Sequence, residues 1–141
     1  MRLPRPTWFA LLPLTVLVGC QEAEGPATYE TTGVVTLSGE AVQGAVLFFQ
    51  PVAGAGKPAQ ATTDAAGMFE VHTAIETNVT KPGMVPGDYR VTVTKLDTSN
   101  VTSTLTPPKN MLPAKYANLG TSELNATVSA DGENHFEFAL E

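Results

Sequence analysis

Short runs of β-forming residues alternate with turn residues along the chain, at intervals of about ten residues from Tyr29 onward. Within these runs apolar and polar side chains alternate, which is typical of strands with one face on a core and the other in water. The run YRVTVTK, residues 89–95, places Tyr89, Val91 and Val93 on one side. No long amphipathic helical pattern stands out, so the sequence predicts an all-β fold.

We expect seven strands, separated by turns rich in Gly, Pro, Asp and Asn. The expected strands are residues 34–37, 45–50, 60–63, 68–73, 89–95, 124–128 and 135–141. The second of these, AVLFFQ, is apolar on both sides, which predicts a strand buried on both faces, with Phe48 and Phe49 inside. The number and spacing of the runs indicate a β-sandwich or a β-barrel.

The segment 97–122 is longer than a structureless loop of a compact domain usually is. Within it, Pro113 stands where helices begin and Gly120 stands where they end. We therefore expect a short helix of one to two turns between these two residues.

The sequence leaves two roles open for this segment. In the first it is a lid, in which Leu112, Tyr116 and Leu119 cover one end of the core. In the second it is a ligand-facing loop, with Lys109, Lys115 and Tyr116 as its contacts. Replacement of Tyr116 separates the two roles, because a lid residue contributes to stability and a contact residue contributes to binding.

The N-terminal residues follow a different pattern. Arg2 and Arg5 precede a mostly apolar run, Trp8 to Val18, and Gly19 stands before Cys20, the single cysteine of the chain. Eleven residues are too few to cross a hydrocarbon core of roughly 30 Å as a helix. The pattern therefore predicts a cleaved targeting signal over residues 1–19 rather than a transmembrane helix.

The last residues of this run, LVGC at Leu17–Cys20, resemble the bacterial lipobox. The resemblance implies cleavage before Cys20 and lipidation of its thiol, and each acyl methylene buried in a membrane contributes about 0.8 kcal/mol. Gln21 stands where an inner-membrane retention signal usually has Asp, so the resemblance favours the outer membrane. Residues 20–29 are mostly polar and small, and we expect them to form a lipidated tether.

Charge excludes one class of partner. The chain has a formal net charge of −6, and without Arg2 and Arg5 the remainder carries −8. An acidic surface without a cluster of Lys or Arg repels phosphate backbones, so we expect no nucleic-acid binding.

The chain lacks the residue patterns of enzymes and metal sites. His72 and His135 fall on outward faces of different expected strands, and neither stands at a ligand spacing from a second histidine or a cysteine. There is no G-x-S-x-G turn for a serine nucleophile. The aspartates of the turns do not form the run of a calcium loop and are explained by turn formation. We expect no catalytic residue, no metal and no cofactor.

Few aromatic side chains are expected at the surface. Trp8 is lost with the signal, and Phe136 and Phe138 alternate as core residues. Only Tyr29 and Tyr116 are expected to be exposed, which argues against a sugar-binding aromatic platform.

Three stretches, TGVVTLSGEAVQGAVLFFQP, TTDAAGMFEV and VPGDYRVTV, together resemble the carboxypeptidase regulatory-like domain, a transthyretin-like, seven-stranded antiparallel β-sandwich, so this is the fold we expect. The chain is similar to small lipoproteins with this domain in planctomycete-type bacteria, over most of residues 30–141. The resemblance implies an accessory, non-catalytic module. The hydroxyisourate hydrolases, an enzyme class with the same fold, end in Tyr-Arg-Gly-Ser, whereas this chain ends in Phe138-Ala-Leu-Glu141, so their activity is not carried over.

We therefore expect three regions: a lipoprotein signal peptide (1–19), a lipidated tether (20–29) and a β-sandwich domain (30–141). The expected function is that of a lipid-anchored lipoprotein of the bacterial cell envelope, with a structural or protein-interaction role. The alternative is an envelope ligand-binding module for carbohydrate or peptide that uses the segment 97–122. The expected partners are the membrane, through the lipid on Cys20, and an envelope protein or polysaccharide.

Overall fold

The computed structural model describes residues 25–54, 56–99, 101 and 103–141. The predicted signal peptide, Cys20 and the first half of the predicted tether lie outside the described residues. In the described part of the chain no helix is long and apolar enough to cross a membrane.

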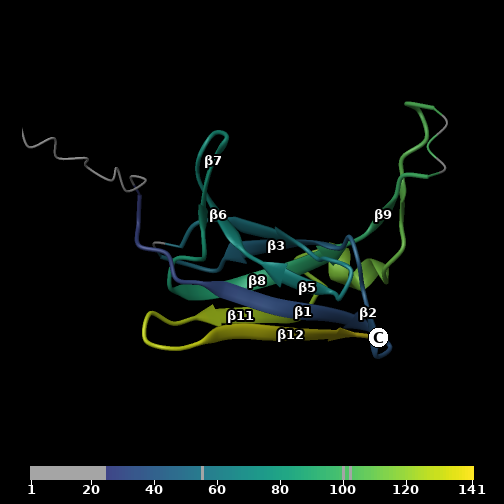
Figure 1. The fold of residues 1–141 in the computed structure, drawn as a ribbon. Helices are drawn as coiled ribbons and strands as arrows, with labels where there is room; N and C mark the ends of the chain where they lie inside the picture. The colour runs from purple at the N-terminus through teal and green to yellow at the C-terminus, as the bar shows by residue number, and fades with distance from the viewer. Residues whose placement is uncertain (1–24, 55, 100, 102) are drawn as a thin grey trace, which may run out of the picture.

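The strands form two principal sheets and one short pair (Figure 1). The small sheet contains β12 (Asn134–Leu140), β1 (Thr31–Leu37), β2 (Glu40–Ala41) and β5 (Met68–Glu70). The large sheet has the order β11 (Leu124–Val128), β8 (Gly87–Thr94), β3 (Val46–Pro51), β4 (Ala59–Thr62), β6 (His72–Glu76) and β7 (Val79–Pro82). The short pair is β9 (Leu96–Asp97) with β10 (Lys109–Asn110). The predicted all-β class is thus confirmed.

The pairing differs from the predicted antiparallel arrangement at one place. The first long strand and the last, β1 and β12, run parallel from Thr31 opposite Asn134 to Leu37 opposite Leu140. The other strand pairs of the described chain are antiparallel. Alternation of side chains has the same period in both arrangements, so the sequence pattern does not carry the direction of pairing.

The structure also contains more strands than the seven predicted. The expected strand 68–73 is divided at Val71, before which β5 pairs with β1 in the small sheet and after which β6 pairs with β4 in the large sheet. β7 forms a hairpin with β6, and Asn78 in its turn has a φ of 65°. β7 has no alternating apolar pattern, because it is an edge strand without a buried side chain.

A single hydrophobic core lies between the buried faces of the two sheets, giving a sandwich-like arrangement. Phe49 of the large sheet lies 6.2 Å from Phe69 and 6.5 Å from Phe138 of the small sheet, measured between ring centroids. Phe69 and Phe138 stack with their centroids 6.0 Å apart. The predicted inward residues of β8 are buried as well.

The predicted burial of AVLFFQ on both faces is wrong. Leu47 and Phe49 are fully buried, but Val46 is 43% exposed and Phe48 is 44% exposed. The outward side of the large sheet therefore carries an aromatic ring at the surface. The reason is that none of the residues described by the structure forms a further layer over this sheet, so an apolar residue on its outward side stays in water.

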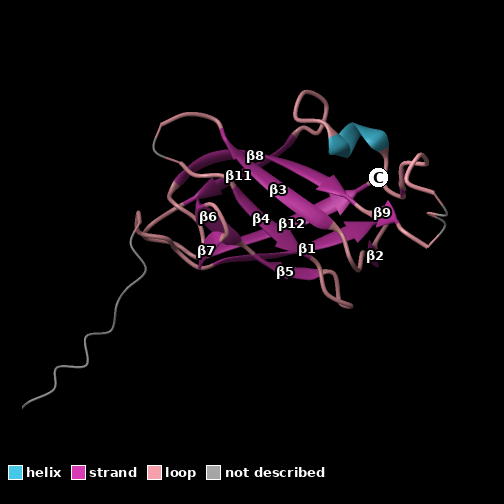
Figure 2. Cartoon of the chain, turned by 90° about the horizontal axis from the view of Figure 1, so that it is seen from above, coloured by secondary structure: helices cyan, strands magenta, loops and turns pink. Residues whose placement is uncertain are grey.

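The two ends of the sandwich carry different features (Figures 1 and 2). At one end, the first described residues lie beside the start of β1 and the β6–β7 hairpin, where Tyr29 and Met84 exchange backbone hydrogen bonds of 2.8 and 2.9 Å. At the opposite end lie the C-terminus, the hairpin that contains β9 and β10, and the 3₁₀ helix η1 (Ala114–Ala117). Pro113 precedes η1, so the predicted short helix is confirmed as a single 3₁₀ turn.

Candidate functional site

The segment 97–122 is divided into two parts. Its first part forms a hairpin that projects from the sandwich and is held at its base by the pairing of β9 with β10 (Figure 1). Its second part, from Met111 onward, returns to the body of the domain. The hydroxyl of Ser122 donates a hydrogen bond to the backbone oxygen of Val91, which fixes the end of the segment on β8.

Of the three predicted contact residues of this segment, only Lys115 and Tyr116 lie together. Lys109 is exposed in β10, opposite Asp97. Lys115 is exposed on η1, with its ammonium nitrogen 4.8 Å from the centre of the Tyr116 ring. Tyr116 itself is only 6% exposed and belongs to the core, so the expectation of a surface ring at this position is wrong. Burial of an apolar ring at the open end of a sandwich removes apolar surface from water and so stabilises the folded state.

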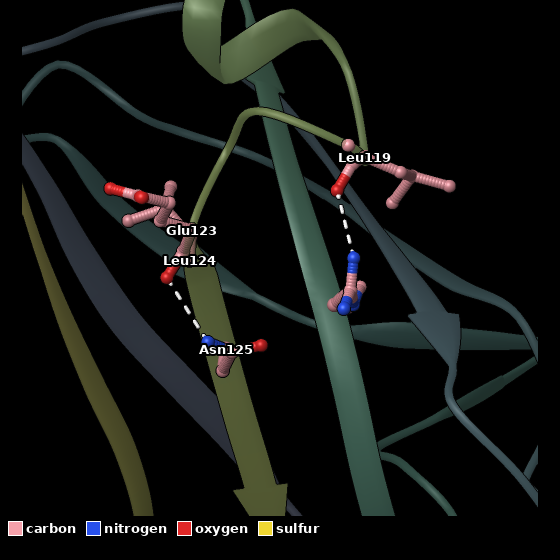
Figure 3. Close-up of a pocket in the computed structure, with 6 residues that line it drawn as sticks. Leu119, Glu123, Leu124 and Asn125 are labelled. Atoms are coloured by element: carbon pink, nitrogen blue, oxygen red, sulfur yellow. Dashed lines mark hydrogen bonds between the residues drawn. The ribbon is translucent and has the colours of Figure 1, made fainter.

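Two of the three predicted lid residues are buried. Leu112 and Tyr116 are buried in the core, as expected of a lid, whereas Leu119 is 38% exposed. Leu119 instead lines a pocket of about 330 Å³ together with Arg90, Gly120, Glu123, Leu124 and Asn125 (Figure 3). This pocket lies where the end of the segment crosses β8 and β11.

Among the described residues that line this pocket, Arg90 is the one positive side chain and Glu123 the one negative side chain. Nη1 of Arg90 donates a hydrogen bond of 3.3 Å to the backbone oxygen of Leu119, and the guanidinium makes no other hydrogen bond or ion pair within the described residues. The Asn125 side chain donates to the backbone oxygen of Glu123 at 3.0 Å (Figure 3). A guanidinium has five N–H donors, so several of them remain for a carboxylate or carbonyl oxygen of a ligand.

A second hollow lies on the same side of the large sheet, toward its opposite edge. It has a volume of about 400 Å³ and is lined by Gln60, Ala61, Thr62, Glu70, His72 and Thr80. The β4–β6 ladder pairs Ala59 with Thr73 and Gln60 with His72 and goes no further. The hollow therefore forms where the chain passes from β5 of the small sheet to β6 of the large one, and the end of β4 has no hydrogen-bonded strand on that side among the described residues.

The two histidines remain apart. His72 is half-buried at the second hollow, and His135 is exposed on β12, where its Nδ1 lies 3.0 Å from the hydroxyl oxygen of Thr32. No group of three His, Cys, Asp or Glu side chains that could hold a metal is found in the part of the chain that the structure describes. Asp64 accepts hydrogen bonds from the N–H groups of Ala66 and Met68, as expected of a turn aspartate.

Phe48 lies between the two hollows. The strand order places β3 between β8, which borders the Arg90 pocket, and β4, which borders the second hollow. We call the outward side of the large sheet, which includes Phe48 and both hollows, the outer face. The sequence contained a signal for the exposure of this face. The outward residues of the strands beside β3, such as Thr62 and Thr92, are polar, and a strand that pairs with two such strands has its outward side in water as well.

No protein-family model, no curated protein and no solved structure matches this chain. The class of the molecule therefore comes from its own structure, which is all-β and sandwich-like with a hollowed outer face.

Proposed function

We propose that this protein is a lipid-anchored lipoprotein of the bacterial cell envelope, whose non-catalytic β-sandwich acts by contact with other envelope components. The observation that carries this proposal is the sequence Leu17–Cys20, LVGC, behind the basic residues Arg2 and Arg5 and a short apolar run. Acylation at Cys20 fixes the domain at a membrane surface without a transmembrane helix.

The arrangement of the ends supports this proposal. The first described residues lie at one end of the sandwich, and the β9–β10 hairpin and η1 lie at the other (Figures 1 and 2). A lipid attached through the N-terminal tether therefore leaves the hairpin end and the outer face free for contacts. We place the lipid in the outer membrane because Gln21 follows the cysteine.

We further propose that the sandwich is of the transthyretin-like kind found in carboxypeptidase regulatory-like domains. Two facing sheets around one core and a short helical turn near the C-terminal strands support this assignment. This assignment requires that the fold also contain the parallel β1–β12 pair and the additional edge strands of this chain.

Metabolic labelling with radioactive palmitate tests the anchor. The wild-type chain, expressed in a bacterium that processes lipoproteins, is expected to incorporate label and to sediment with membranes. The variant Cys20→Ala is expected to do neither. Label that persists in Cys20→Ala, or a wild-type chain that takes up no label, contradicts the proposal. The proposal that the sandwich is non-catalytic is tested with ester and amide substrates, for which we expect no turnover.

The Arg90 pocket favours a second candidate function, that of an envelope ligand-binding module. Leu119 and Gly120 of the segment 97–122 line this pocket, and the guanidinium of Arg90 has donors left for an acceptor. A peptide with a free terminal carboxylate fits this chemistry, because arginine binds carboxylates through paired N–H groups.

Titration of the protein with N-acetylalanine, followed by amide NMR, tests this second function. We expect shifts at Gly120 and Asn125 that disappear in Arg90→Gln and persist in the control Lys115→Gln. An unchanged spectrum of the wild-type protein at millimolar ligand excludes a carboxylate site at Arg90.

A further inference from the structure

The ring of Phe48 lies at the centre of the outer face. In the register of the large sheet, Phe48 stands opposite Gln60 of β4 on one side and Thr92 of β8 on the other. Val46, two residues earlier on the same strand, stands opposite Thr62 and Thr94. Nearly half of the Phe48 side chain is in water, at 44% exposure.

The cross-strand neighbours of this ring are polar but uncharged. Those of Val46 and Phe48 are three threonines and one glutamine, and Gln50 follows on the same strand. From Cys20 onward the chain carries a net charge of −8, yet none of these positions bears a carboxylate. The charged residues lie further out, with Arg90 opposite Gln50 and Glu70 in the lining of the second hollow.

The size of the apolar surface selects the kind of occupant. A phenylalanine exposed to this extent presents on the order of 100 Å² of ring surface. A stable protein partner covers about 800 Å² on each side, with an apolar centre made of several side chains. Among the described residues of β3, β4 and β8, only Val46 and Phe48 are exposed large apolar side chains, and Val52 follows directly after β3. The patch is therefore narrow and matches one flat, small ring rather than a protein.

We propose that the outer face binds a neutral polysaccharide, with one sugar ring stacked on Phe48. The C–H groups on one face of a pyranose carry partial positive charge, and the face of an aromatic ring is negative, so the two attract. Sugar hydroxyls both donate and accept hydrogen bonds, as do threonine hydroxyls and the glutamine amide. Gln60 and Thr92 flank Phe48 in the register, and Thr62 stands two residues from Gln60 on β4, so all three are available to the hydroxyls of a stacked sugar.

The two hollows extend this site across the strands. Neighbouring strands lie about 4.8 Å apart, so the four steps from β11 to β6 span roughly 19 Å. The Arg90 pocket lies at one end of this line and the hollow lined by Gln60 and His72 lies at the other. A chain of several sugar units therefore fits across the sheet, with its middle unit on Phe48.

This inference rests on the second candidate function, that of a ligand-binding module, and names the chemical class of the ligand. It places the centre of the site at Phe48 rather than at the segment 97–122. It is independent of the lipid anchor, since Cys20→Ala is expected to bind the polysaccharide as the wild-type chain does. It also differs from a carboxylate site, because the binding of an uncharged sugar chain is expected to be the same at low and high salt, whereas the binding of N-acetylalanine through Arg90 is expected to weaken as the salt concentration rises.

Sedimentation of the purified full chain with insoluble cellulose and chitin, together with titration by cellohexaose and chitohexaose, tests the proposal. We expect the wild-type protein to bind at least one of these polymers. Phe48→Ala is expected to weaken binding at least tenfold, and Phe48→Trp, with a larger ring, is expected to bind as well as wild type or better. The matched control is Leu105→Ala, at an exposed apolar residue of the β9–β10 hairpin that is 90% exposed.

Thermal unfolding of Phe48→Ala shows whether this variant is folded. If it is not, the binding of Phe48→Trp relative to wild type serves as the test. Three outcomes overturn the proposal: no binding of wild type to either polymer, equal loss in Phe48→Ala and Leu105→Ala, or a wild-type dimer that Phe48→Ala dissociates. The last outcome assigns the patch to a second copy of this chain. Binding of N-acetylalanine without binding of either polymer keeps the ligand-binding candidate and rejects the sugar site.

Discussion

The hydroxyl oxygen of Tyr116 accepts a hydrogen bond of 3.0 Å from the backbone N–H of Glu141, the last residue of the chain. This contact joins η1 to the end of β12, and the ring of Tyr116 is buried in the core beneath it. The second part of the segment 97–122 is therefore fixed to the C-terminal strand by both packing and a hydrogen bond.

Replacement of Tyr116 is expected to cost stability. Tyr116→Ala removes a buried ring and is expected to lower the free energy of unfolding by about 3 kcal/mol. Tyr116→Phe removes only the hydrogen bond to Glu141 and is expected to cost about 1 kcal/mol. Urea unfolding followed by circular dichroism measures both, with Leu105→Ala as an exposed control expected within about 0.5 kcal/mol of wild type. A Tyr116→Ala variant as stable as the control contradicts the lid.

Much of the fold could be predicted from the sequence because one-sided burial leaves an alternating pattern. Strands such as β8 and β11 show it, since their inward residues are apolar and their outward residues are polar. β3 was predicted wrongly because Val46 and Phe48 are apolar on the outward side as well. Apolar residues in water and apolar residues in a second core give the same pattern, and only the neighbouring strands distinguish them.

The candidate site was harder to predict than the fold. Arg90, Leu119 and Asn125 come from three separate parts of the chain and meet only through the pairing of β8 with β11 and the return of the segment 97–122. The predicted contacts Lys109, Lys115 and Tyr116 all belong to the segment 97–122. They do not form one surface, since Lys109 lies in the projecting hairpin, Lys115 lies on the 3₁₀ turn, and the Tyr116 ring is buried.

A titration in the alkaline range is expected to report on Tyr89. Burial raises the pKa of Tyr89 above its ordinary value of 10.0, because the ionised phenol loses hydration, and a backbone hydrogen bond from Lys57 opposes this effect. Its hydroxyl donates a hydrogen bond of 2.7 Å to the backbone oxygen of Val85. Below about pH 10 the phenol is neutral in both the folded and the unfolded chain, so its contribution is constant.

Above this pH the unfolded chain ionises at Tyr89 before the folded chain does. Stability is therefore expected to fall as the pH rises from about 10 toward the folded pKa. Urea midpoints measured between about pH 8 and about pH 11 test this, with Tyr89→Phe as the comparison. The variant is less stable at neutral pH, because Val85 loses its donor, but its midpoint is expected to decline less steeply. Equal slopes for both proteins exclude Tyr89 as a cause of the alkaline loss.

Gly33 of β1 is expected to tolerate no side chain. A Cβ at this position would lie 2.2 Å from the backbone oxygen of Phe136 and 2.4 Å from Cζ of the Phe69 ring. Gly33→Ala is therefore expected to destabilise the fold by about 3 kcal/mol, through displacement of the ring or the strand. Gly132→Ala is the matched control, because its nearest neighbour would be Cβ of Ser129 at 3.7 Å. Similar urea midpoints for the two variants would show that Phe69 moves aside at little cost.

The hydroxyl of Thr63 satisfies two backbone groups in the interior. It accepts a hydrogen bond of 2.8 Å from the N–H of Ala45 and donates one of 2.5 Å to the oxygen of Val42. Thr63→Val keeps the shape of the side chain and leaves both groups without this partner, so we expect a loss of about 3 kcal/mol in the free energy of unfolding.

Two further variants separate the hydroxyl of Thr63 from its methyl group. Thr63→Ser keeps the hydroxyl and removes one methyl group, which is expected to cost about 1 kcal/mol. Thr62→Val, at the exposed neighbouring position, is expected to change stability by less than about 0.5 kcal/mol. Urea unfolding is then expected to rank Thr62→Val as the most stable variant, Thr63→Ser as the next and Thr63→Val as the least stable. A Thr63→Val protein more stable than Thr63→Ser would mean that packing of the methyl groups, and not the two hydrogen bonds, holds residues 42–45 against β4.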